Sequence, residues 1–348
     1  MTNTEFLIVG NGLAGTLLAF ELFDRGLDFR IMTSPEKSRA SVVAAGMFNP
    51  LVFKRMTKSW MIDELIPAMN KKFTELEDKL QQKFLFQKEI LKPLSEQELL
   101  LWKERSTDFE FSKYIRSVKI AEQFSGIKQS TGFGIVTQSG YLKLKEFLVA
   151  AEDFFRRKNK LINGTFSFQK FNPESDSWQF NEWNFNKIIF CEGHHITRNP
   201  VFKHIPFKPV KGEVLQLFIP ELTEEFIINR RVFVLPTGNH RFKVGSTYEW
   251  EDLTERPTNE GRNSIIRRLE ELISADYKIE QHWAGIRPAV IDRRPVLGFH
   301  HTYKNIAVFN GLGTKGVMLA PYFAHEMLNV LTARNYSVND EVRVERFL

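Results

Sequence analysis

A glycine-rich turn near the N-terminus constrains the fold of this chain more than any other feature. Its glycines, within Gly10–Gly15, follow the G-x-G-x-x-G pattern and come directly after the wholly apolar run Phe6–Val9. Such a run is typical of a strand buried on both faces in a parallel sheet. Apolar residues recur at helical spacing over Leu13–Phe20, and Asp28–Met32 has the pattern of a second strand. This succession predicts a βαβ unit.

The three glycines of the turn have separate expected roles. Gly10 permits the tight turn, Gly12 lets a diphosphate approach the backbone, and Gly15 lets the helix pack close to the strand. The N-terminus of the following helix offers free N–H groups and a partial positive charge to phosphates. The sequence therefore predicts a dinucleotide diphosphate held by Gly10, Asn11, Gly12, Leu13, Ala14 and Gly15.

The acidic residue that usually binds the ribose is missing. Roughly 20 residues after the turn, where Asp or Glu would bind the 2′-hydroxyl, the chain has Met32-Thr33-Ser34. Either a hydroxyl of Thr33 or Ser34 takes its place, or Glu36 reaches back from beyond the strand. A third possibility is NADP, whose 2′-phosphate would meet a cation from Arg30, Lys37 or Arg39. The turn alone leaves flavin and nicotinamide cofactors open.

Further along the chain the patterns predict a mixed α/β protein. Residues 60–125 are mostly helical in pattern, and Tyr141–Lys158 is typical of an amphipathic helix. Residues 205–250 alternate short β-like runs with Pro and Gly turns, which indicates an antiparallel sheet. Lys187–Phe190 and Asn305–Phe309 are expected strands, the latter followed by a long amphipathic helix. We predict a discontinuous Rossmann-like domain of residues 1–80, 141–204 and 283–348, and a mixed antiparallel-sheet substrate domain of residues 81–140 and 205–282.

Composition narrows the class of protein without naming its chemistry. The single cysteine, Cys191, excludes an internal disulfide and favours a reducing compartment. The N-terminus lacks the basic region of a signal peptide, and no window approaches the roughly 18 apolar residues of a membrane helix. A cytoplasmic protein without a membrane span is expected. The net charge of +6 favours anionic ligands, but no run of five basic residues occurs.

Five further segments bring in a family resemblance. Ser41–Met47, Ile188–Gly193, Trp283–Pro288, Asp292–Gly298 and Asn310–Gly316 resemble, in order, the flavin-binding segments of the D-amino acid oxidase and glycine oxidase (DAO) superfamily. The resemblance implies an FAD-dependent oxidoreductase whose cofactor is not covalently bound. Small side chains suit a flat ring that lies against backbone. Besides Thr33 and Ser34, the residues expected to contact FAD are Ser41, Ala45, Gly46, Met47, Cys191, Glu192, Gly193, Gly311, Leu312, Gly313, Thr314, Lys315, Gly316 and Val317.

The same resemblance implies a substrate contact at Arg287, in a Gly-aliphatic-Arg-Pro motif. Family members bind the substrate carboxylate with this arginine, and a guanidinium fork fits a carboxylate bidentately. The alternative is a structural arginine paired with Asp292 or a backbone carbonyl. Phe233 stands where the family tends to have a tyrosine, so a glycine-like substrate is in doubt. We predict oxidation of a C–N bond in a small-molecule amine or amino acid, with hydride passing to the flavin.

Three alternative functions remain at this stage. Ala45–Pro50 resembles the oxidase half of a bifunctional tRNA wobble-uridine modification enzyme, and the basic pI of 9.2 agrees with RNA binding. The methyltransferase half of that family and a dense basic patch are both missing, so RNA is the minor expectation. The other two are an NADP-dependent dehydrogenase and a flavin-binding protein without turnover. No metal site is expected, and His300 and His301 are expected on an exposed loop.

Overall fold

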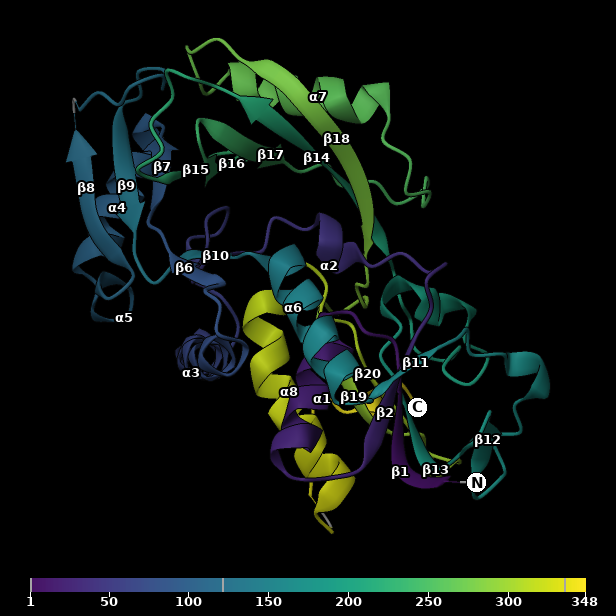
Figure 1. Ribbon diagram of the computed structural model, residues 1–348. Coiled ribbons are helices and arrows are strands. Elements are labelled where there is room, and N and C mark those ends of the chain that lie inside the picture. Colours follow the sequence, from purple (N-terminus) through teal and green to yellow (C-terminus); the bar gives the residue numbers. More distant parts are fainter. Residues whose placement is uncertain (1, 121, 335) are drawn as a thin grey trace.

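The computed structural model describes residues 2–120, 122–334 and 336–348 and contains two large sheets (Figure 1). In the first sheet the neighbouring strands β2, β1, β13 and β20 are all parallel to one another, as the wholly apolar run Phe6–Val9 in β1 predicted. The strand order is β11 (Leu161–Asn163), β2 (Phe29–Thr33), β1 (Thr2–Val9), β13 (Trp183–Phe190), β20 (Ile306–Asn310) and β19 (Val296–Phe299), with β12 (Trp178–Phe180) beside β13.

Three helices pack together beside this sheet: α1 (Leu13–Asp24), α6 (Leu144–Arg157) and α8 (Gly316–Thr332). Helix α1 follows β1 directly through the glycine turn and leads into β2, which confirms the predicted βαβ unit. Its Phe20 ring lies 4.6 Å from the Phe155 ring of α6, centroid to centroid. Aromatic packing therefore fixes the helix that begins at the turn.

The second sheet has eight strands and is mostly antiparallel, with β15 and β7 as its one parallel pair among the described residues. Helix α7 (Asn259–Glu270) packs on the side of this sheet that faces away from the first sheet (Figure 1). The antiparallel sheet expected over residues 205–250 is thus present. The strand order is β18 (Lys278–Arg287), β14 (Val210–Phe218), β17 (Arg241–Gly245), β16 (Phe233–Gly238), β15 (Ile227–Asn229), β7 (Ile90–Leu94), β9 (Gly132–Val136) and β8 (Ile115–Ile120).

The mostly helical prediction for residues 60–125 is only partly right. This region has three helices, but strands β7 and β8 and the short β6 (Leu85–Gln87) interrupt them. Every residue of β7 is buried, because the strand pairs with β15 and β9, which are distant in sequence. Long-range pairing of this kind leaves no local periodicity. The helices are α3 (Ile62–Leu80), α4 (Glu96–Thr107) and α5 (Phe109–Ser112).

Smaller elements lie between the two large sheets. They are the four-residue helix α2 (Ala40–Val43), a sheet in which β10 (Gly140–Leu142) pairs with β3 (Met47–Phe48) and β6, and the pair β4 (Leu51–Val52) and β5 (Thr57–Lys58). Strand β18 runs across the boundary predicted at residue 282, so the exact domain ranges stay a prediction. Among the described residues, no helix is both long and apolar enough to cross a membrane.

Candidate active site

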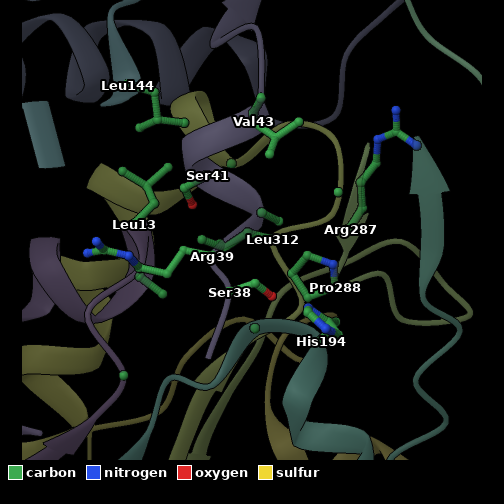
Figure 2. A pocket seen from close by; sticks show the side chains of 18 of the residues that line it. Leu13, Ser38, Arg39, Ser41, Val43, Leu144, His194, Arg287, Pro288 and Leu312 are labelled. Atoms are coloured by element: carbon green, nitrogen blue, oxygen red, sulfur yellow. The ribbon is translucent and has the colours of Figure 1, made fainter. Parts of the chain in front are cut away.

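A deep pocket lies where the carboxyl ends of β1, β2 and β13 meet the second sheet. Ligands of open α/β sheets bind at this edge. Figure 2 shows Leu13 and Arg39 on one side of the pocket and Arg287 on the other, with Ser38 and Ser41 between. The nucleotide turn and the predicted substrate arginine therefore open into one cavity.

The glycine turn forms a cradle that fits a diphosphate. Gly10 has a φ of +111°, and a Cβ there would lie 2.5 Å from the carbonyl oxygen of Cys191. A Cβ on Gly15 would lie 2.0 Å from the Gly10 carbonyl oxygen, whereas one on Gly12 would meet only Ser41 Oγ, at 4.0 Å. The first turn of α1 has no acidic residue, and no side chain caps its N-terminus. Free space and free N–H groups thus coincide above Gly12.

The segment Ser41–Met47 presents backbone and small side chains to the pocket. Gly46 has a φ of +73°, and a Cβ there would lie 2.1 Å from the carbonyl oxygen of Leu142 in β10. Val43 of α2 packs on Gly285 of β18, where an added Cβ would lie 3.3 Å away. Because Gly46 packs closely on β10 and Val43 packs closely on β18, this segment forms a thin wall of the pocket against which a flat ring can lie.

The last loop closes the pocket and is tied to both neighbouring segments. The buried side chain of Asn310 donates from Nδ2 to the Gly193 carbonyl (3.0 Å) and accepts from the Gly311 N–H at Oδ1 (2.8 Å). Gly313 N–H donates to the Pro288 carbonyl (3.2 Å). Helix α8 then begins without an acidic residue in its first turn or a side-chain cap. Its N-terminus can stabilise negative charge on a bound ring.

Arg287 ends β18 and is largely buried at the other end of the pocket. Its Nη2 donates to Ser246 Oγ (2.7 Å), and Nη1 donates to the carbonyls of Lys211 and Thr247 (both 3.3 Å). None of the carboxylates in the described ranges forms a salt bridge with it; Asp292, one of the two alternative partners, pairs with Arg346 at 2.8 Å, whereas the other alternative, a backbone carbonyl, is present in the two bonds to Lys211 and Thr247. Burial lowers the pKa of Arg287 from its ordinary value. A buried cation without an anionic partner is poised to bind one.

Most of the predicted contact residues line the pocket, but four do not. Gly15 packs on Gly10, the Thr33 carbonyl accepts from Gly164 N–H, and Gly311 packs on the backbone around Arg294. Lys315 points out of the pocket and donates to Ser59 Oγ (2.8 Å). Those that line it are Gly10, Asn11, Gly12, Leu13, Ala14, Ser34, Ser41, Ala45, Gly46, Met47, Cys191, Glu192, Gly193, Arg287, Leu312, Gly313, Thr314, Gly316 and Val317.

At the ribose end, the structure narrows the candidates that the sequence left open. Ser34 and Lys37 line the pocket, whereas Glu36 does not. Lys37 Nζ lies 3.3 Å from Glu192 Oε1, and Asn199 donates to the other carboxylate oxygen (2.9 Å). Burial raises the pKa of Glu192 and shields the ion pair between Glu192 and Lys37 from solvent. Arg30 lies outside the pocket, stacked on Trp183.

Several pocket residues were not found from the sequence. The signals were weak, because Ser246 and Tyr248 belong to an irregular connection and Leu144 and Phe166 to segments without a motif. The segments that carry the family resemblance contain Val43, Ala44, Gly285, Pro288 and Asn310, which could have been found from them. Some of the missed residues were named from the sequence without an expected flavin contact: Lys37, Arg39, Val43, Ala44, Phe233, Gly285, Pro288 and Asn310. The remaining ones are Val9, Met32, Ser38, Ala40, Leu144, Gly164, Phe166, His194, His195, Gly212, Val214, Ser246 and Tyr248.

The cysteine and the two histidines that line the pocket are expected to carry no charge at neutral pH. Burial raises the pKa of the Cys191 thiol, so no nucleophilic thiolate faces the pocket. Burial lowers the pKa of His194 to about 4, and His195 Nε2 lies 3.2 Å from the Ser38 carbonyl oxygen. Neither histidine therefore adds positive charge beside a bound cofactor at neutral pH.

The exposed position predicted for His300 is wrong, because its ring is buried between Phe202 and Tyr303. His301 is exposed, and His204 lies beside both. His300 Nδ1 accepts from the N–H groups of Thr302 and Tyr303, at 3.1 and 3.2 Å. The neutral ring then carries its proton on Nε2 and has no free lone pair for an ion. We assign no metal to this cluster, and the expected absence of a metal stays a prediction.

The parallel sheet and the glycine cradle define a dinucleotide-binding class of protein, and comparison with known families identifies the dinucleotide. The family model described as FAD dependent oxidoreductase (DAO) matches residues 5–329. The chain belongs to this family. The predicted cofactor, FAD without a covalent bond, is confirmed, and the NADP alternative is not supported.

Individual relatives are distant. The chain is 26% identical to glycine oxidase of Bacillus subtilis (strain 168) over 156 residues, 43% of this chain and 40% of that protein. It is 24% identical to the tRNA 5-methylaminomethyl-2-thiouridine biosynthesis bifunctional protein MnmC of Legionella pneumophila (strain Lens) over 307 residues, 84% of this chain and 45% of that protein. The chain thus spans less than half the length of either relative.

Solved structures show the same fold at low identity. Glycine oxidase from Geobacillus kaustophilus superposes with a TM-score of 0.78 at 17% identity, covering 97% of each chain. Iminodiacetate oxidase (IdaA) from Chelativorans sp. BNC1 gives 0.81 at 18% identity, covering 99% of this chain and 98% of that one. These likenesses confirm the predicted fold class.

Proposed function

We propose that this chain oxidises the C–N bond of a small amine or amino acid that carries a carboxylate. The carrying observation is the partly buried Arg287 guanidinium, which has no anionic partner among the described residues and opens into the cofactor pocket. Glycine oxidase and iminodiacetate oxidase, whose names give carboxylate-bearing amines as substrates, support the proposal. The cytoplasmic location stays a prediction.

The chain's own residues bind and orient the substrate in this proposal. FAD, when bound, supplies the hydride acceptor and passes the electrons on. Arg287 holds the carboxylate bidentately, and Ser246 and the backbone carbonyls of Lys211 and Thr247 hold Arg287. An amine that arrives deprotonated loses a hydride from its α-carbon as the C=N bond forms, so no side-chain acid–base pair is required. Orientation is the main contribution of the protein.

Arg287→Ala tests this proposal. Because hydrogen bonds to charged groups contribute about 1.5–3 kcal/mol, the variant should bind a carboxylate inhibitor such as glycolate at least about tenfold more weakly. The measurement is a titration followed by flavin absorbance, which needs no turnover. Arg287→Lys, the matched variant, keeps the charge without the fork and should lose part of the affinity. Unchanged affinity in Arg287→Ala would remove Arg287 from the site.

Turnover itself is tested by anaerobic mixing of the FAD-loaded protein with a panel of small amines and amino acids. Bleaching of the flavin absorbance by a carboxylate-bearing amine supports an oxidase or dehydrogenase. A protein that binds FAD and glycolate but is reduced by no amine would instead be the flavin-binding protein without turnover.

A flavoenzyme acting on a modified tRNA base is the second candidate function. The alignment with the bifunctional tRNA-modifying protein covers 84% of this chain, about twice the share aligned with glycine oxidase. The pI of about 9.2 also favours a polyanion. RNA that co-purifies with the protein, with affinity that falls steeply as salt rises, would support it. Salt-independent retention of RNA would count against it.

A further inference from the structure

Two large aromatic side chains stand exposed at the mouth of the pocket. Tyr248 is 54% exposed and Trp250 is 49% exposed, and their ring centroids are 6.3 Å apart. The Tyr248 ring also lines the pocket and lies 4.7 Å from the Arg287 guanidinium. The order from inside to outside is therefore Arg287, Tyr248, Trp250.

The connection that carries this pair, residues 246–258 between β17 and α7, is held firmly on β14. The backbones of Lys211 and Glu249 exchange both hydrogen bonds, at 2.8 and 3.0 Å. Lys211, whose side chain is fully buried, donates from Nζ to Asp252 Oδ2 (2.5 Å) and to the Arg256 carbonyl (2.7 Å). Lys211 thus fixes the segment before Trp250 through its backbone and the segment after Trp250 through its buried ammonium group.

Glu213, a buried residue of β14, fastens the two ends of the same connection, one through its backbone N–H and the other through its carboxylate. Glu213 N–H donates to Thr247 Oγ1 (2.9 Å), and its carboxylate accepts from the N–H and Oγ1 of Thr258 at 3.0 and 2.8 Å. His282 Nε2 lies 2.8 Å from Glu213 Oε2. Burying two charged side chains costs free energy unless each is fully paired. This network keeps Tyr248 and Trp250 in place although solvent surrounds much of both rings.

We propose that Tyr248 and Trp250 form an outer subsite that binds a flat aromatic substituent of the substrate amine while Arg287 holds its carboxylate. The proposal rests on the proposed function. Tyr248 lines the pocket, where its hydroxyl can meet a polar group of the substituent. Offset or edge-to-face packing on the two rings supplies the affinity.

The chemistry of the connection favours a small molecule as the source of the flat ring. Four acidic residues lie close to the aromatic pair: Glu249, Glu251, Asp252 and Glu255. A phosphate backbone passing over them would be repelled. The subsite therefore disfavours an RNA base as the flat ring that it binds.

The test compares two N-substituted glycines, N-benzylglycine and N-methylglycine, by rapid anaerobic mixing with the FAD-loaded protein, and takes the dissociation constant of each from the concentration dependence of the rate of flavin reduction. N-benzylglycine should bind more tightly, by about three- to tenfold for each ring that it contacts. Trp250→Ala and Tyr248→Ala should each reduce this preference, and glycolate, which lacks the substituent, should bind Trp250→Ala as it binds the parent protein. Phe109→Ala removes an aromatic ring that is 89% exposed on α5 and serves as the matched control.

Conservative variants distinguish the loss of ring packing with the substituent from a loss of folded protein. Trp250→Phe should keep most of the preference, and Tyr248→Phe should keep the stacking part of it. Equal binding of the two glycines, or a preference that survives both alanine variants, would overturn the subsite while glycolate binding through Arg287 still upheld the proposed function. Failure of glycolate to bind would instead reject the proposed function. Displacement of N-benzylglycine by tRNA at low salt would overturn the small-molecule source.

Discussion

The two ends of the pocket supply positive charge in different ways. At the nucleotide end the charge comes from backbone N–H groups of α1 and α8, whose first turns carry no acidic side chain. At the substrate end it comes from one guanidinium, Arg287, held by groups from two other segments of the chain. The first device depends on local spacing and the second on tertiary contacts, so mutations should separate them.

The largest expected contrast is between one methyl group added at two positions of the glycine turn. In Gly15→Ala the new Cβ would lie 2.0 Å from a backbone oxygen, so the backbone must move, and we expect a loss of at least about 3 kcal/mol of folding free energy. In Gly12→Ala the Cβ has free space, and the loss should stay below about 1 kcal/mol. Thermal unfolding of the FAD-free proteins measures both.

Titration with FAD adds a measurement of cofactor affinity to the comparison of Gly12→Ala with Gly15→Ala. The Gly12→Ala methyl occupies the space that a diphosphate needs, so FAD affinity should fall at least about tenfold although the fold is kept. Gly26→Ala, at a helix end remote from the pocket, is the control for destabilisation: its φ of +72° strains the added methyl group, but FAD affinity should stay that of the parent protein. Parent-like FAD affinity in Gly12→Ala would show that the cradle is not the diphosphate site.

An intermediate effect is expected from Gly212→Ala at the substrate end. A Cβ there would lie 1.9 Å from Arg287 Nη2, and because the end of an arginine is flexible, the guanidinium should swing away without unfolding the protein. Glycolate affinity should drop at least about tenfold while FAD affinity stays unchanged. In the double variant with Arg287→Ala no further loss should occur, since both changes remove one interaction. Additive losses would contradict this coupling.

The smallest expected effect concerns Lys315, which the sequence placed in the pocket and the structure turns toward Ser59. Burial, helped by the charge of Arg294, lowers the pKa of Lys315 to about 8. Between that value and its ordinary value the unfolded chain binds more protons, so this group makes the folded state more stable as pH rises through the window. The melting temperature of the parent relative to Lys315→Met should rise by roughly 2 °C from pH 7 to pH 9.5. A pH-independent difference would refute the shift.

The sequence predicted the first sheet better than the second. Strands β1, β13 and β20 show as short apolar runs, since their last residues are buried on both faces, whereas β2 is indicated by its place after the glycine turn and helix α1. Strand β7 is equally buried but holds Lys92 and Pro93, and only its pairing with β9 and β15 reveals it. A run that contains a charge and a proline reads locally as something other than a central strand.

The sequence by itself determined the cofactor loops of this protein. The roles of Gly10, Gly12 and Gly15 depend on the absence of a side chain at fixed spacing, which a sequence records directly. Only the tertiary structure decided that Thr33 and Lys315 face away from the pocket and that Lys37 lines it. At the substrate end the sequence indicated Arg287 through its motif, but only the fold brought Gly212, Ser246 and Tyr248 to it, because they come from another strand and a connection whose contacts leave no local pattern.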